Sequence, residues 1–339
     1  MLELVNVERE RVGVPQLVLG NNPVAQMHAD SMLKNCFSAH WGLDGLTPTM
    51  RYNLLGGYQV NAENVSGLDY CYTKSDRVIS RDTMLEVAQA VDGFMKSEGH
   101  RETMLDPNYS IASLGISYDA YNFQVSQHFE GYYIRYDHFP SIDEDGVLSL
   151  SGAVLNGASL SDSKDLEITV IYDQVPYELT RGQVSRTYGS CLGEVLLEVR
   201  GPAPRGTTWA DDWYEGNRME CPSPYDVDPE APGAVSPQEA RNLFREAKEA
   251  WEFAEFAGRV RVPFVDATRW RVRESSFDVE VDMSSFLVSE GGVYMIVVWA
   301  EVEKRTEIVS EYSVWVGATP PEKYAEVLNG DYRFDNSQK

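Results

Sequence analysis

The pattern of apolar residues changes near residue 138, and this change constrains the fold more than any other feature. Before it, apolar residues recur at helical spacing, most clearly at Met84, Val87, Val91 and Phe94. After it, short strand-like runs follow one another between turn signals. A chain of 339 residues is long enough to form a core in each part. We therefore expect one domain over residues 1–137 and a second over 138–339.

The first part is predicted to mix helices with a small antiparallel sheet. We expect helices over 2–12, 22–35, 47–55 and 82–97, and strands over 111–118 and 123–129. Thr47 followed by Pro48 is typical of a helix start, and Gly99 is expected to end the last helix as a left-handed cap. Residues 57–81 are expected to form a long polar loop that carries Glu63. This order predicts an α+β fold with helices layered on a sheet.

The second part is predicted to be an all-β sandwich, with an immunoglobulin-like arrangement as one form that it can take. The expected strands are 147–150, 166–172, 194–200, 260–265, 277–281, 293–301 and 306–316. One segment differs, because Ser236-Pro237-Gln238-Glu239 forms a capping box with proline at the first helical position. We therefore expect one inserted helix at about 237–256.

Three short segments of the first part carry the residues that point to chemistry. They contain His40, Glu63 and His100. These residues lie too far apart for a local motif, so only the fold can bring them together. Histidine and glutamate in one site can hold a divalent metal with an open position for water. They can also act as a general acid and base without a metal.

These segments resemble those of the CAP superfamily, which contains cysteine-rich secretory proteins, venom antigens and plant pathogenesis-related proteins, and its bacterial SCP-like branch above all. The matching stretches are Phe37-Ser38-Ala39-His40, Ala62-Glu63-Asn64, Phe94-Met95-Lys96-Ser97-Glu98-Gly99-His100-Arg101 and Ser126-Gln127-His128-Phe129. Their order over roughly 130 residues makes the resemblance specific. It implies a three-layer α-β-α sandwich over residues 1–137.

The resemblance also implies a cleft with His40, Glu63 and His100 as candidate catalytic residues. His40 and His100 are the expected ligands of a divalent metal such as zinc. The family's second glutamate would be Glu98 or Glu86. Glu98 stands where bacterial relatives have proline, and Glu86 falls on the polar side of its predicted helix, where surface exposure is expected.

Charge and cysteine content restrict the partners and the compartment. The net charge of −24 argues against nucleic-acid binding. The sequence contains no run of 18 apolar residues, so no transmembrane segment is predicted. The pairing that keeps both disulfides within a domain is Cys36–Cys71 with Cys191–Cys221; four free thiols are the alternative. No signal peptide is visible. The family resemblance implies an extracellular or cell-surface protein whose leader is absent from this sequence; a cytosolic protein is the alternative.

These observations favour an exported CAP-domain protein whose His/Glu cleft binds a divalent metal or a small ligand. The β domain would serve for binding or attachment. Two alternatives remain open. One is a metal-dependent hydrolase in which Glu63 is the general base for a water bound by His40 and His100. The other is a secreted lipid- or sterol-binding protein. The sequence makes no case for catalysis over binding, and the ligand can be a small molecule, a lipid or a protein.

Overall fold

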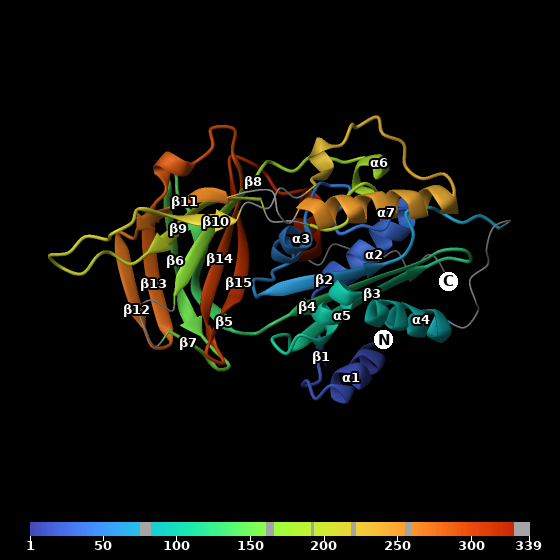
Figure 1. Cartoon of the computed structure of the whole chain (residues 1–339), viewed down its shortest axis with the longest axis horizontal. Helices are drawn as coiled ribbons and strands as arrows, with labels where there is room; N and C mark the ends of the chain where they lie inside the picture. Colours follow the sequence, from blue (N-terminus) through green and yellow to red (C-terminus); the bar gives the residue numbers. More distant parts are fainter. Residues whose placement is uncertain (75–82, 161–165, 191–192, 218–221, 255–258, 329–339) are drawn as a thin grey trace.

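The computed structural model describes residues 1–74, 83–160, 166–190, 193–217, 222–254 and 259–328. It shows an α+β chain in which a helix-rich part and a strand-rich part lie side by side (Figure 1). None of the helices in these ranges has both the length and the apolar character needed to cross a lipid bilayer.

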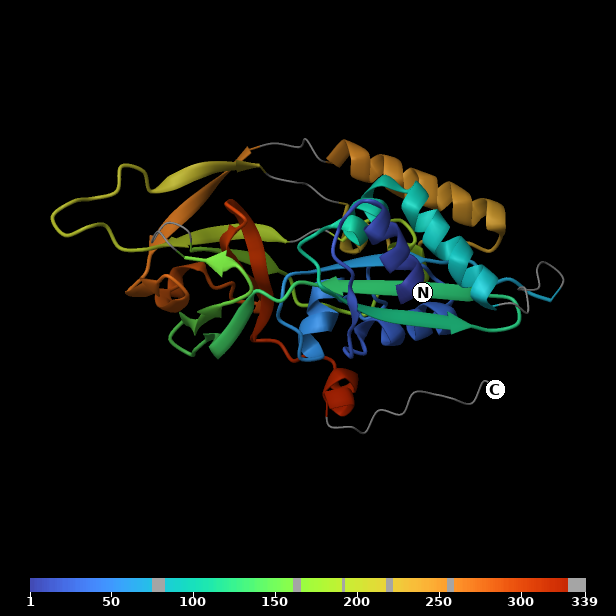
Figure 2. The same ribbon diagram turned by 90° about the horizontal axis from the view of Figure 1, so that it is seen from below.

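The helix-rich part is a three-layer sandwich around one four-stranded sheet. In spatial order the strands are β1 (Val18–Leu19), β3 (Ile111–Tyr118), β4 (Phe123–Glu130) and β2 (Asn61–Ser66). One face is covered by α1 (Leu2–Arg11), α4 (Thr83–Lys96) and α5 (Glu98–Leu105), and the other by α2 (Val24–Asn35) (Figures 1 and 2). Gly115 allows α2 to approach closely, because a Cβ there would lie 2.0 Å from the carbonyl oxygen of Ala25.

Local signals account for most of these elements. Helix α3 (Pro48–Leu54) begins as expected, with Thr47 Oγ1 accepting from the Met50 N–H at 3.2 Å. The predicted cap at Gly99 is wrong, since this residue lies within α5 and its φ is not positive. The predicted polar loop is also wrong at Glu63, which lies in β2. Strand β2 escaped prediction because its buried side chains are polar and do not alternate with apolar ones.

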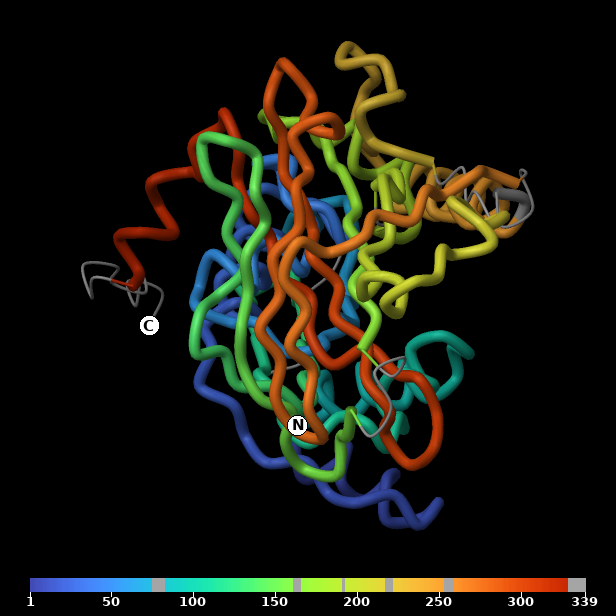
Figure 3. Tube along the Cα trace, turned by 90° about the vertical axis from the view of Figure 1, so that its left-hand side faces the viewer, coloured from blue at the N-terminus to red at the C-terminus, as the bar shows by residue number. Residues whose placement is uncertain are grey.

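The strand-rich part consists of two sheets packed face to face. The four-stranded sheet has the order β12 (Arg269–Arg273), β13 (Ser276–Asp282), β6 (Val147–Val154) and β5 (Ile134–Ile142), and Figure 3 shows these strands running side by side. The other sheet has the order β10 (Trp213–Asn217), β11 (Arg259–Asp266), β9 (Glu194–Arg200), β8 (Glu167–Asp173), β14 (Gly292–Val302) and β15 (Arg305–Val316), with β7 (Ala158–Ser159) beside β14. Leu148, Val279 and Ile296 are among the buried residues that fill the space between the sheets.

Strand β5 runs across the expected domain boundary at residue 137. Its residues Ile134 and Tyr136 are already buried in the core of the sandwich. The polypeptide therefore enters the strand-rich part a few residues earlier than the change in sequence texture indicates.

Segments from the second half of the chain also return to the helix-rich part and cover it. One carries α6 (Arg181–Val184), a second carries η1 (Pro224–Asp226) and α7 (Pro237–Ala254), and the third is α8 (Glu322–Leu328). Leu179 and Val184 pack with Phe37 and Trp41. The Tyr324 hydroxyl donates to Asp44 Oδ2 at 2.8 Å. The two parts therefore share apolar contacts and hydrogen bonds and do not merely follow one another along the chain.

The predicted disulfide between Cys36 and Cys71 is confirmed, and it links the end of α2 to the segment after β2. The second expected pair, Cys191–Cys221, lies outside the described residues.

Candidate functional site

A cleft of about 1130 Å³ lies beside the exposed edge of β2. Residues of β2, the loop that carries His40, and helices α4 and α5 form one part of its lining. Helix α7 and residues 185–190, which belong to the strand-rich part, also line it. In Figure 2 α7 lies beside α4, and residues of both helices line the cleft. The cleft is thus built from both halves of the chain.

The structure brings His40 and Glu63 into contact at this cleft. His40 Nδ1 lies 3.1 Å from Glu63 Oε1. Arg51, from α3, reaches the same carboxylate, with Nη2 at 3.0 Å from Oε2 and 3.3 Å from Oε1. Ser126 Oγ of β4 donates to Oε2 at 3.3 Å. Glu63 is buried and accepts from three side chains, so it is a fixed part of the framework.

The charge of Arg51 determines the protonation state of the Glu63 carboxyl group. Burial alone would raise the pKa of Glu63, but Arg51 and, to a smaller extent, His28 and His40 hold it well below its usual range. Glu63 is therefore ionised at neutral pH and can only accept hydrogen bonds. The hydrogen of a neutral His40 ring must then be on Nδ1, which leaves the lone pair on Nε2.

His100 also lines the cleft, and it lies at the start of α5. Its ring meets Phe94 edge-on at 5.1 Å between centroids, and its backbone carbonyl accepts from Asn64 Nδ2 at 3.0 Å. Burial lowers the pKa of His100 to about 4, with smaller contributions from the charges of His40 and Lys248. His100 is therefore neutral at pH 7.

Two further histidines lie close enough to Glu63 to interact with its charge, and neither lines the cleft. His28 of α2 is buried, and its Nε2 lies 2.8 Å from the Ala39 carbonyl oxygen and 4.0 Å from Glu63 Oε1. His128 of β4 is buried against Tyr52, with 4.6 Å between ring centroids. Burial lowers the pKa of each to about 4. From its position on the flank of the predicted helix over 22–35, the sequence predicts a partly exposed His28, and this prediction is wrong.

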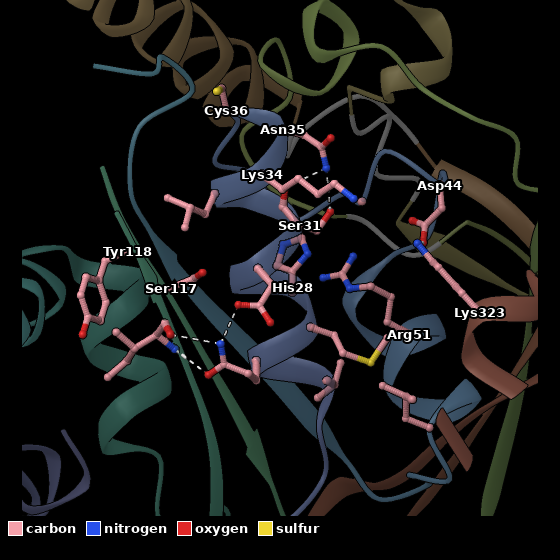
Figure 4. Close-up of a pocket in the computed structure, with 18 of the residues that line it drawn as sticks. His28, Ser31, Lys34, Asn35, Cys36, Asp44, Arg51, Ser117, Tyr118 and Lys323 are labelled. Atoms are coloured by element: carbon pink, nitrogen blue, oxygen red, sulfur yellow. Dashed lines mark hydrogen bonds and ion pairs between the residues drawn. The ribbon is translucent and has the colours of Figure 1, made fainter. Parts of the chain in front are cut away.

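A second cavity, of about 1120 Å³, lies against α2 (Figure 4). His28 and Arg51 lie side by side in this view, and both line that cavity. Because Arg51 holds Glu63, which lines the cleft, the buried ion pair forms part of the wall that separates the two cavities.

The two candidates for a second glutamate do not join this site. Glu98 is exposed and does not line the cleft. Glu86 is buried in α4, contrary to the expected exposure, and it does not line the cleft either. Sequence reasoning missed Arg51, and it missed Lys248 and Trp251 on the α7 wall. A lone arginine in a short helix gives no signal in a single sequence.

The donor groups suit a metal ion only in part. Within the described ranges, no group of three or more His, Cys, Asp or Glu side chains is arranged to hold one. His40 Nε2 and the neutral ring of His100 are two suitable donors. Glu63 is less suitable because both of its oxygens are bonded to Arg51.

Comparison with known proteins assigns the first part of the chain to a family. Residues 2–129 match the model of the Cysteine-rich secretory protein family, CAP. These residues form a CAP domain. Among solved structures, the chain is similar to an extracellular protein containing a SCP domain from Bacillus anthracis str. Ames, with 26% identity and a TM-score of 0.30. The likeness covers 38% of this chain and 38% of that one. The curated proteins include no match.

Proposed function

We propose that the cleft of this CAP domain is a binding site whose central group is His40 Nε2. The observation that carries the proposal is the chain of contacts from Arg51 through Glu63 to His40 Nδ1. This arrangement orients the ring and leaves an unprotonated nitrogen as an acceptor. A carboxylate behind a histidine is the usual support for a metal-binding imidazole.

A divalent metal such as zinc is the ligand that this chemistry fits best. His40 and His100 line the same cleft, and His100 is neutral at pH 7 because burial lowers its pKa to about 4. Two imidazoles form a small ligand set, so we expect modest affinity, with the remaining positions filled by water or by a second ligand. Binding should weaken on acidification because both rings must be neutral.

Hydrolysis with Glu63 as general base is a weaker alternative. A general base works best when its pKa lies near the working pH. The pKa of Glu63 is held well below its usual range, and both oxygens are bonded to Arg51. Its environment therefore suits orientation of His40 better than proton abstraction.

Lipid or sterol binding is also weaker, because Glu63, Asn64 and His100 line the cleft together with its apolar residues. An acyl chain placed over these groups would remove them from water without offering hydrogen bonds.

An extracellular location is part of the proposal. The Cys36–Cys71 disulfide supports it, since disulfides persist in oxidising compartments. The role that we propose for the strand-rich part is to complete the cleft through α7, in addition to any function in attachment.

Calorimetric titration with zinc at high ionic strength tests the metal site, because salt screens nonspecific binding to the acidic surface. We expect His40→Ala to abolish the specific binding. His138→Ala is the matched control, since His138 is exposed in β5 and its ring hydrogen-bonds to Ser141 and Ser149, away from the cleft lining. If His40→Ala binds zinc as the wild type does, His40 is not a metal ligand.

A further inference from the structure

Among the described strands, none pairs with the outer edge of β2, which faces the cleft. β2 is the last strand of its sheet, and all of its residues line the cleft. The Gly131 N–H donates to the Val60 carbonyl, on the side of β4. Because backbone groups alternate along a strand, those of Ala62 and Asn64 also face β4, and those of Glu63 and Val65 face outward. In the described part of the chain, no group bonds to these outward N–H and C=O groups.

The cleft beside this edge has a cationic rim. Lys96 of α4 and Arg241 and Lys248 of α7 line it, in a chain whose net charge is −24. The ion pairs of Lys96 with Asp92 and of Lys248 with Glu252 are exposed, so they compete only weakly with a ligand.

Three acidic residues also line the cleft, but none leaves an exposed negative charge. Glu63 is paired with Arg51, and Asp69 and Glu311 are buried. Glu311 accepts from Asn61 Nδ2 at 3.1 Å. The charge that a ligand meets at the rim is therefore mainly positive.

We propose that an extended acidic peptide segment binds in this cleft by adding as a strand to β2. Its backbone pairs with the N–H and C=O groups of Glu63 and Val65, and its acidic side chains lie toward Lys96, Arg241 and Lys248. Main-chain pairing supplies affinity and the walls select side chains, as in other cases of strand addition. The cleft volume of about 1130 Å³ exceeds the roughly 300–1,000 Å³ of typical small-molecule sites.

This inference deepens the proposed function by naming a class of ligand for the same cleft, but it does not require a metal at His40. The test uses the full chain and an array of acetylated heptapeptides in which every second residue is Asp or Glu. These acidic peptides should bind, and matched peptides in which Lys replaces each Asp or Glu should not. Methylation of the peptide amides that face β2 should weaken binding roughly tenfold or more, because each removes a backbone hydrogen bond.

Two further measurements locate the binding. Hydrogen exchange should show protection of the Glu63 and Val65 amides when the best acidic peptide is bound. Lys248→Glu should weaken binding, and Lys34→Glu should not, since Lys34 carries the same charge but lines the other cavity. An array in which acidic peptides bind no better than basic ones overturns the proposal, as does binding that is unaffected by amide methylation. Zinc binding that persists in either case would leave the proposed metal site standing.

Discussion

Replacing Glu63 by glutamine should destabilise the protein strongly, because it leaves a buried arginine without its counter-charge. The side chains of Arg51 and Glu63 are 4% and 1% exposed, and their closest atoms are 3.0 Å apart. Removing one member of such a buried pair costs about 3–5 kcal/mol. Glutamine keeps one oxygen to accept from Arg51, so Glu63→Gln should lie near the lower limit and Glu63→Ala near the upper one.

Replacing the other member of the pair, Arg51→Met, should make the free energy of unfolding depend on pH in a defined direction. Without Arg51, burial raises the pKa of Glu63 above the value of an unfolded chain. A raised pKa stabilises the folded state at low pH, and this stabilisation is lost as the pH rises through the folded value. Arg51→Met should therefore be more destabilised at pH 8 than at pH 5, relative to the wild type. It also loses the bonds from Arg51 Nη1 to the carbonyls of His40 and Leu46.

Urea denaturation, followed by tryptophan fluorescence and near-ultraviolet circular dichroism, measures these effects. The double variant should cost less than the sum of the two single ones, because it leaves neither charge unpaired. Glu8→Gln is the control, since the Arg11–Glu8 pair is exposed and should contribute about 1 kcal/mol or less. A cost below about 1 kcal/mol for Glu63→Gln would refute the assignment of Glu63 as the essential counter-charge.

Three other predictions concern stability. Burial lowers the folded pKa of His28 and of His128 to about 4. Each therefore contributes up to about 3 kcal/mol to the free energy of unfolding, and this contribution is present above pH 6.5 and lost as the pH falls towards 4. Urea midpoints that do not fall between pH 7 and pH 4.5 would contradict this. Burial raises the folded pKa of Glu311 to about 7. The stability that protonated Glu311 contributes is therefore lost as the pH rises through 7. Glu311→Gln should raise the thermal midpoint relative to the wild type more at pH 8.5 than at pH 5. The Cys36–Cys71 bond closes a loop with a sequence separation of 35, so its replacement by two alanines should cost about 3–4 kcal/mol in the chain-entropy model, and an unchanged urea midpoint would show that the loop is already restricted without it.

The sequence predicted most of the regular elements because their signals are local. The strand over 194–200 and the strand over 111–118 match β9 and β3 residue for residue, since each is a short run bounded by turns. The capping box at Ser236 placed the start of α7 at Pro237. β2 was missed because buried Asn61, Glu63 and Asn64 are stabilised by polar partners that lie far away in sequence.

The site was predictable only where the family motifs reach. Those motifs contain His40, Glu63 and His100, and the structure places all three at one cleft. They do not contain Arg51, whose charge determines the protonation of Glu63. The motif also does not show that Glu98 is exposed. Its neighbours Ser97, Gly99 and His100 all line the cleft, so position in the motif alone does not separate Glu98 from them.

The position of α7 has the largest consequence for function. Its sequence predicts an amphipathic helix, but an apolar face with Ala240, Ala247 and Trp251 does not say what surface it covers. In the structure these residues line the cleft of a CAP domain that ends more than one hundred residues earlier in the chain. Arg241 and Lys248 line it from the same helix. The His/Glu group therefore comes from the CAP domain, and under the proposed function part of the selectivity for a ligand would come from the strand-rich part. Relatives with the same motifs and a different partner domain would keep the first and change the second.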